Sequence, residues 1–241
     1  MEKVIDLEEI DSKSIQDIIG ISGEYLFLTS LENYSTHIYK ETKRVKIIER
    51  FICKNIFNEG NTTILAGALV KDNLSRLGTL IYLDKNLNII NKIIDPHSIF
   101  SEFVWSDGKI VISNSLKEDI FNGDIIELNS MNKLKLPYVI TGEYEFRSAV
   151  KYKDNYIIYG NDKDNYRGII VKMTKNNIEL QDITIDNDLW EFTNIKLYEE
   201  EIILSGNKWN KTGFNGFVMK LPITLNYKVL NIELESNWFE A

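Results

Sequence analysis

The sequence has very little cysteine, histidine and proline: among 241 residues there are one cysteine, two histidines and three prolines. The single cysteine, Cys53, cannot form an intramolecular disulfide, and its apolar surroundings predict a buried, inert thiol. A Ser-His-Asp triad or a histidine-based metal site would have to use His37 or His97. We therefore expect no cofactor and no bound metal.

Long hydrophobic runs and an excess of positive charge are also missing. The longest apolar runs are a few residues, against the roughly 20 that cross a bilayer. The first ten residues alternate apolar and acidic side chains and lack the pattern of a secretory signal. The 28 Lys and Arg against 36 Asp and Glu give a net charge of −8. We expect a cytoplasmic protein that binds neither nucleic acid nor a membrane.

The common catalytic motifs do not occur: there is no G-x-S-x-G, H-E-x-x-H, P-loop or G-x-G-x-x-G. The stretch Asp162–Gly168 resembles the start of a calcium loop, but Tyr166 stands at a ligand position and the closing glutamate is missing. A solvated hairpin loop is the favoured interpretation of this stretch. We expect a chain that is not an enzyme.

An internal repeat is the main positive feature of the sequence. Each copy pairs an apolar strand with a second strand that begins with glycine, at Gly78, Gly123, Gly168 and Gly216, which lie 45, 45 and 48 residues apart. The first strand of each copy ends in a glycine, except in one copy, where Asn114 takes its place. The four pairs are Thr63–Gly67 with Gly78–Leu83, Ile110–Asn114 with Gly123–Leu128, Tyr156–Gly160 with Gly168–Met173, and Ile202–Gly206 with Gly216–Leu221. Tyr25–Tyr39 is a fainter first copy.

Each copy is flanked by further strand patterns. Aromatic-rich strands precede it, for example at Glu145–Val150, and alternating strands follow it, for example at Asn88–Ile94 and Tyr227–Leu234. Four short strands repeated about every 45 residues are typical of a β-propeller blade, because stacked blades cover each other's apolar faces. An open or incomplete array and a six-bladed ring with degenerate ends are the alternatives.

We therefore predict an all-β fold, a β-propeller of five blades with four antiparallel strands each, with residues 1–241 as a single domain. A strand at 3–7 would help to close the ring. The predicted blades span residues 12–50, 51–97, 98–142, 143–188 and 189–236.

The repeat resembles those of bacterial and archaeal β-propeller proteins, which read in outline I-V-A-G, a loop, G-x-I-V-K-L-D, then N-G-N. Ile157–Gly160, followed by Gly168–Met173 and Asn176–Ile178, carries this resemblance, and Thr79–Asp84 followed by Asn86–Asn88 matches it too. The resemblance covers most of the chain and implies the fold. It further implies adhesion, binding or scaffold roles, because such repeats carry no catalytic residues as a family.

A glutamate followed by phenylalanine recurs at Glu102, Glu145 and Glu191, with Glu49-Arg50-Phe51 as a looser copy. In successive blades these acids would occupy equivalent places. They could form an acidic ring that binds a cation or basic peptide, or supply the carboxylate pair of a glycosidase. In the structural interpretation, the phenylalanines pack between blades and the glutamates accept hydrogen bonds from neighbouring turns.

Two aromatic residues are further binding candidates. Trp209 falls in a predicted loop, 207–215, flanked by lysines, where an exposed binding aromatic is typical. Tyr166 lies in the predicted hairpin loop after Asp162. Trp105 and Trp190 lie in predicted strands and are expected in the core.

The predicted function is a non-enzymatic propeller that binds a protein or peptide partner across one face. The first alternative is a carbohydrate-binding or glycoside-hydrolase-like propeller, with a glycan as ligand. The second is an immunity- or antitoxin-like acidic protein that masks a basic partner.

Overall fold

The computed structural model describes residues 17–30, 33–95, 100–117, 120–129, 143–163, 167–174, 178–183, 189–210 and 213–222. These residues form eighteen strands, arranged in five antiparallel sheets, and no helix. The prediction of an all-β fold is confirmed. No described segment is a helix of the length and hydropathy that a membrane span requires. The chain divides into two compact units, 1–140 and 141–241, each described by itself below.

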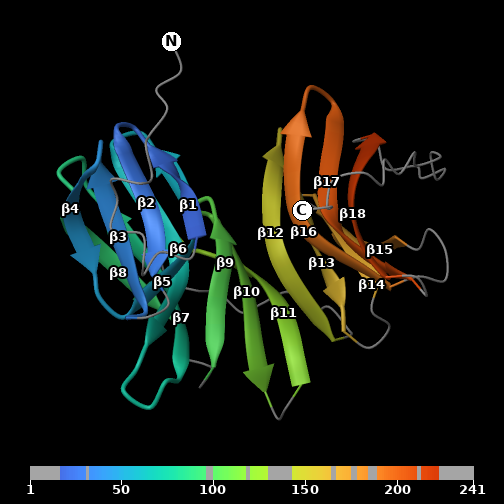
Figure 1. The fold of residues 1–241 in the computed structure, drawn as a ribbon, viewed down its shortest axis with the longest axis horizontal. Coiled ribbons are helices and arrows are strands. Elements are labelled where there is room, and N and C mark those ends of the chain that lie inside the picture. Colours follow the sequence, from blue (N-terminus) through green and yellow to red (C-terminus); the bar gives the residue numbers. More distant parts are fainter. Residues whose placement is uncertain are drawn as a thin grey trace. The chain divides into compact units, whose positions relative to one another are not determined.

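Unit 1 holds three sheets, and in each the strands pair in chain order (Figure 1). Sheet 1 contains β1 (Asp17–Ser22), β2 (Tyr25–Ser30), β3 (Ser35–Lys40) and β4 (Lys43–Ile48). Sheet 2 contains β5 (Phe51–Glu59), β6 (Thr62–Val70), β7 (Arg76–Leu83) and β8 (Ile89–Ile94). Sheet 3 contains β9 (Ser101–Ser106), β10 (Ile110–Lys117) and β11 (Ile120–Glu127).

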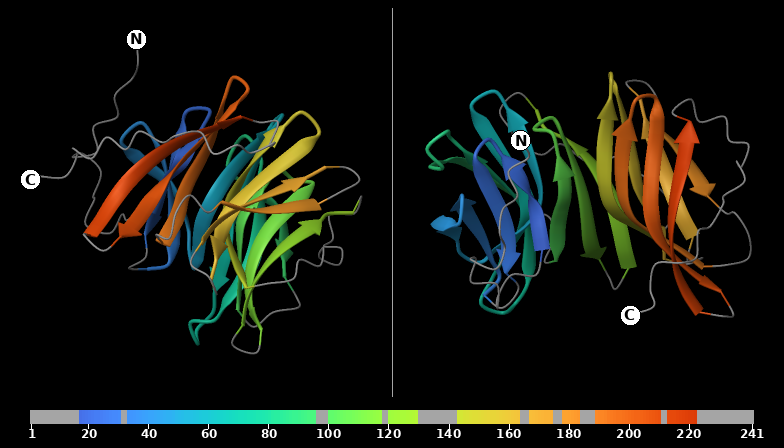
Figure 2. Two further views of the ribbon diagram at one scale, coloured as in Figure 1. Left: turned by 90° about the vertical axis from the view of Figure 1, so that its right-hand side faces the viewer. Right: turned by 45° about the horizontal axis from the view of Figure 1, so that its top comes forward.

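Unit 2 holds two sheets with the same order, drawn from yellow to red in Figure 2. Sheet 4 contains β12 (Tyr144–Tyr152), β13 (Asn155–Asp162), β14 (Arg167–Met173) and β15 (Ile178–Ile183). Sheet 5 contains β16 (Leu189–Tyr198), β17 (Glu201–Asn210) and β18 (Gly213–Pro222). The predicted strands at 3–7 and 227–234 lie outside the described residues, and the single five-bladed ring stays a prediction.

A β-bulge occurs at the same place in all five sheets. The ladder between the first and second strand shifts register by one residue, so that one residue of the first strand has no partner opposite it. The five bulge residues are Ile19, Lys54, Val104, Arg147 and Thr193.

The first glycine of the repeat accommodates this bulge. Gly67, Gly160 and Gly206 each pair with the residue just before the bulge. A Cβ on these glycines would lie 2.0, 2.3 and 2.0 Å from a carbonyl oxygen of the first strand, closer than non-bonded carbon and oxygen atoms can approach. In sheet 3 the equivalent residue is Ser113, and not Asn114 as the repeat pattern predicts.

The second glycine accepts a ring from the next sheet. A Cβ on Gly78 would lie 2.5 Å from the ring of Phe103, and one on Gly168 would lie 2.4 Å from the ring of Phe192. Both phenylalanines are fully buried. The repeated Gly and Phe positions are therefore two halves of one contact between successive sheets.

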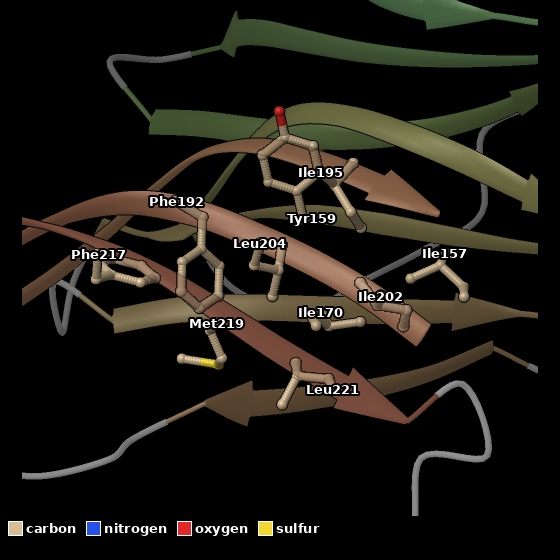
Figure 3. Close-up of a cluster of buried hydrophobic side chains, with 10 residues drawn as sticks. All are labelled: Ile157, Tyr159, Ile170, Phe192, Ile195, Ile202, Leu204, Phe217, Met219 and Leu221. Atoms are coloured by element: carbon tan, nitrogen blue, oxygen red, sulfur yellow. The ribbon is translucent and has the colours of Figure 1, made fainter. Parts of the chain in front are cut away.

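Apolar side chains from neighbouring sheets fill the space around these contacts. In unit 2, sheets 4 and 5 form one cluster, shown in Figure 3, in which the rings of Phe192 and Phe217 meet edge to face with centroids 5.8 Å apart. In unit 1, sheets 1 and 2 form a second cluster that includes Cys53. Burial raises the pKa of the Cys53 thiol to about 12, as expected for an inert cysteine.

We predict that Gly168→Ala destabilises the protein by about 1–3 kcal/mol, because the added methyl group overlaps the buried ring of Phe192. Gly216 is the matched control. It occupies the same position in sheet 5, but among the described residues a Cβ there would meet only a carbonyl oxygen at 4.0 Å, so Gly216→Ala should change stability by less than about 0.5 kcal/mol. Urea unfolding measures the free energy of unfolding of both variants, and equal losses of stability would refute this explanation.

Candidate functional site

The three Glu-Phe pairs lie on the first strands of sheets 3, 4 and 5, just before the bulge. Phe103, Phe146 and Phe192 are fully buried. For Phe103 and Phe192 the structural interpretation is confirmed, because each ring packs on a glycine of the preceding sheet. The glutamates lie at the edge of these contacts and keep part of their surface in solvent.

Glu102 is neutralised by two cations of the preceding sheet. Its carboxylate lies 3.6 Å from Nζ of Lys54 and 3.5 Å from Nη1 of Arg76. The side chain of Glu102 is 18% exposed, so both pairs are better shielded from solvent than an ordinary surface ion pair. These pairs join sheet 3 to sheet 2.

Glu145 and Glu191 share a single guanidinium. Arg147 places Nη1 3.2 Å from Glu145 and donates a hydrogen bond from Nη2 to Glu191 at 2.9 Å. Lys163 pairs with the second oxygen of Glu145. Two carboxylates and two cations thus form one neutral cluster that joins sheets 4 and 5.

The cations come from a repeated position. Lys54 and Arg147 are both bulge residues, and each reaches the glutamate of the following sheet. We expected neighbouring turns to supply hydrogen bonds to these acids; the structure shows ion pairs, and the bulge residues Lys54 and Arg147 supply three of them. Glu102, Glu145 and Glu191 therefore help to hold neighbouring sheets together, and a binding role for them stays a prediction.

A repeated asparagine, which the sequence pattern did not reveal, lies opposite each of the three glutamates. On the second strands of their sheets, Asn114, Asn161 and Asn207 pair with Glu102, Glu145 and Glu191. The side-chain oxygen of Asn161 accepts a hydrogen bond of 3.0 Å from the backbone N–H of Phe192, on the next sheet. These glutamates and asparagines are visible in the sequence beside the glycines of the repeat. They align with one another only when the extra residue of the bulge is included in the count. The looser pair at Phe51 is not equivalent, because the register puts Cys53 at this position.

Trp209 does not lie in a loop, so that expectation is wrong. Strands β17 and β18 continue to the hairpin, and Trp209 pairs with Leu189 on one side and Phe214 on the other. The asparagine, lysine and glycine residues of this stretch predicted a loop, but backbone pairing with the neighbouring strands keeps them in β17 and β18. Trp209 is 39% exposed and lies on the same face of sheet 5 as Glu191, two residues along the register.

The remaining sequence candidates are of two kinds. Tyr166 and His97 lie outside the described residues, as do residues 164–166 of the suspected calcium loop. His37 is buried on β3, where its Nε2 lies 3.0 Å from the Ser35 hydroxyl; burial and the nearby Arg44 lower its pKa. No three His, Cys, Asp or Glu side chains come together as a possible metal site among the residues with a described position.

A feature that the sequence does not reveal is the exposure of apolar side chains on outer strands. Five of the nine large hydrophobic residues that are exposed in the described part of the chain lie on β4 and β8. They are Val45, Ile47, Ile89, Ile90 and Ile94. Their alternation looks the same in sequence as that of a buried strand, so only the structure separates them.

A shallow hollow lies beside the turn between β6 and β7. Its lining includes Arg50, Val70 and Asp72, and the ion pair between Arg50 and Asp72 lies in it. Because both side chains are well exposed, the hollow offers little shielding from solvent to a ligand.

No protein-family model matches the chain, and no curated protein matches it in sequence. Among solved structures, it is similar to the β-propeller domain of the Trilobed protease from Pyrococcus furiosus, with 13% identity, a TM-score of 0.50 and 83% of this chain and 65% of that one covered. A prolyl endopeptidase structure gives 10% identity, a TM-score of 0.54, and 89% and 41% coverage. The chain thus spans less than two thirds of either protein.

A third structure, the GH43_1 enzyme from Xanthomonas citri in complex with xylotriose, is 8% identical with a TM-score of 0.47, and 96% of this chain and 99% of that one are covered. This likeness is too weak to carry an argument about activity. The first two comparisons support the β-propeller fold and nothing finer.

We predict that Arg147→Met lowers the free energy of unfolding by about 1–3 kcal/mol, because it leaves two partly buried carboxylates without their shared cation. Lys54→Met is the matched bulge variant. It should cost less than about 1 kcal/mol, since Arg76 remains beside Glu102. Denaturant unfolding at low and high salt measures both, and the prediction fails if Lys54→Met is the more damaging change.

Proposed function

We propose that the chain is a five-bladed β-propeller that binds a protein or peptide partner and does not act as an enzyme. The observation that carries this proposal is the use of the repeated acids: Glu102, Glu145 and Glu191 are each paired with lysine or arginine. A glycosidase needs one carboxyl group that donates a proton and another that stays ionised. The neutral cluster around Arg147 favours cohesion over such a division of roles.

The exposed outer strands support a binding role. Soluble proteins keep large apolar side chains exposed together mainly where they meet a partner. Val45, Ile47 and Ile90 are 44, 39 and 58% exposed on strands at the ends of their sheets. The exposed ring of Trp209 is a second proposed contact.

To test the proposal, the tagged full-length chain is used to capture proteins from its source cells at low and high salt. Each candidate is then purified and titrated against the chain by calorimetry, where we expect binding near one to one. In parallel, glycan arrays are screened and release of reducing sugar is measured. Carbohydrate binding, or sugar release abolished by Glu145→Gln or Glu191→Gln, would overturn the proposal, as would the failure of every purified candidate to bind.

A further inference from the structure

The outer strand of sheet 1 combines exposed apolar residues with positive charge. Strand β4 reads Lys-Arg-Val-Lys-Ile-Ile and contains no acid, although the chain as a whole carries a net charge of −8. Lys43, Arg44, Val45 and Ile47 are exposed. The outer strand of sheet 2, β8, has the same character: it contains Lys92, no acid and three exposed isoleucines.

Strand β4 contacts the segment just before β8. Ile48 of β4 and Leu87, two residues before β8, share a hydrophobic cluster, and the Lys46 amine donates a hydrogen bond to the carbonyl oxygen of Leu87. This contact occupies Lys46. The positive charges that remain exposed along β4 are therefore those of Lys43 and Arg44.

Strand β4 is also the last strand in its sheet. The order is β1-β2-β3-β4, and none of the other described strands pairs with the outer side of β4. A strand in this position presents backbone N–H and C=O groups that another extended chain can bind. Lysine and arginine oppose pairing with a second copy of the same strand, because like charges would face each other. The same cations attract an acidic strand.

We infer that β4 binds an extended segment of a partner protein in which acidic residues alternate with β-branched apolar ones, and that this segment adds to sheet 1 as a further strand. The register places Lys43 on one face of β4 and Arg44 and Ile47 on the other, with Val45 at a bulge. The partner's backbone would pair with β4, its acids would lie beside Lys43, and its apolar residues would cover Ile47 and the neighbouring Val45. Arg44 would add to the positive charge that attracts the acids. This inference rests on the proposed binding function and names its surface and the chemistry of its ligand.

The test uses two labelled peptides of equal length, one alternating glutamate with valine and one alternating lysine with valine, titrated against the full-length chain by fluorescence anisotropy. We expect the glutamate peptide to bind and the lysine peptide not to bind. In the double variant Lys43→Glu with Arg44→Glu, affinity for the glutamate peptide should fall about tenfold or more, and the lysine peptide should gain affinity. Leu74→Glu, which adds an acid at a residue that is 60% exposed outside both strands, should leave binding unchanged.

Hydrogen exchange locates the contact, since the amides of residues 43–48 should gain protection when the glutamate peptide binds. Equal binding of both peptides, or indifference of the glutamate peptide to the double variant, would overturn the inference. Self-association of the wild-type chain that the double variant abolishes would also overturn it, by assigning the strand to a second copy.

The two proposals fail separately. A captured partner that binds the double variant as tightly as the wild type refutes a role for β4 and leaves the binding function intact. If no partner binds at all while the glutamate peptide binds β4, the proposed function fails and the affinity of β4 for acidic strands remains.

Discussion

The seating of a phenylalanine ring against a glycine of the preceding sheet is the contact on which the described structure depends. The ring of Phe192 lies where a Cβ of Gly168 would be, and Phe103 is placed in the same way over Gly78. This close approach brings the first strand of one sheet directly onto the middle of the one before it. Three other features accompany this close approach. The bulge and the first glycine avoid steric overlap between the first and second strands, and the asparagine accepts a hydrogen bond from the next sheet's backbone.

The charged residues on the first strands of the sheets follow from the same geometry. A bulge residue projects toward the next sheet, so a lysine or arginine there reaches the glutamate beside the seated phenylalanine. Sheet 3 has Val104 at its bulge. In sheet 4, Glu145 is neutralised from within its own sheet by Arg147 and Lys163. A row of acids that looks like a binding ring in the sequence is therefore locally compensated in each unit.

Much of the fold was predictable from the sequence because strand signals are local. The first strand of sheet 4 lies where an aromatic-rich stretch predicted a strand, and β8 lies where alternating residues predicted one. The register was not predictable, because one inserted residue shifts every later pairing without leaving a mark in composition. This is why Asn114 was aligned with glycines and Phe51 with the seated phenylalanines. The loop predicted around Trp209 failed for a related reason, since cross-strand pairing outweighed the turn preferences of asparagine and glycine.

The contact between sheets has two unlike sides, and this asymmetry bears on how such a chain can evolve. Sheets 2 and 4 each offer a glycine to the next sheet, and sheets 3 and 5 each offer a phenylalanine to the sheet before. Duplication or loss of one repeat of about 45 residues would therefore preserve this kind of contact. Gene-level changes in repeat number would then alter the number of sheets while the chemistry of each contact stayed constant. Selection could adjust size in whole repeats, and adjust recognition independently through the outer strands.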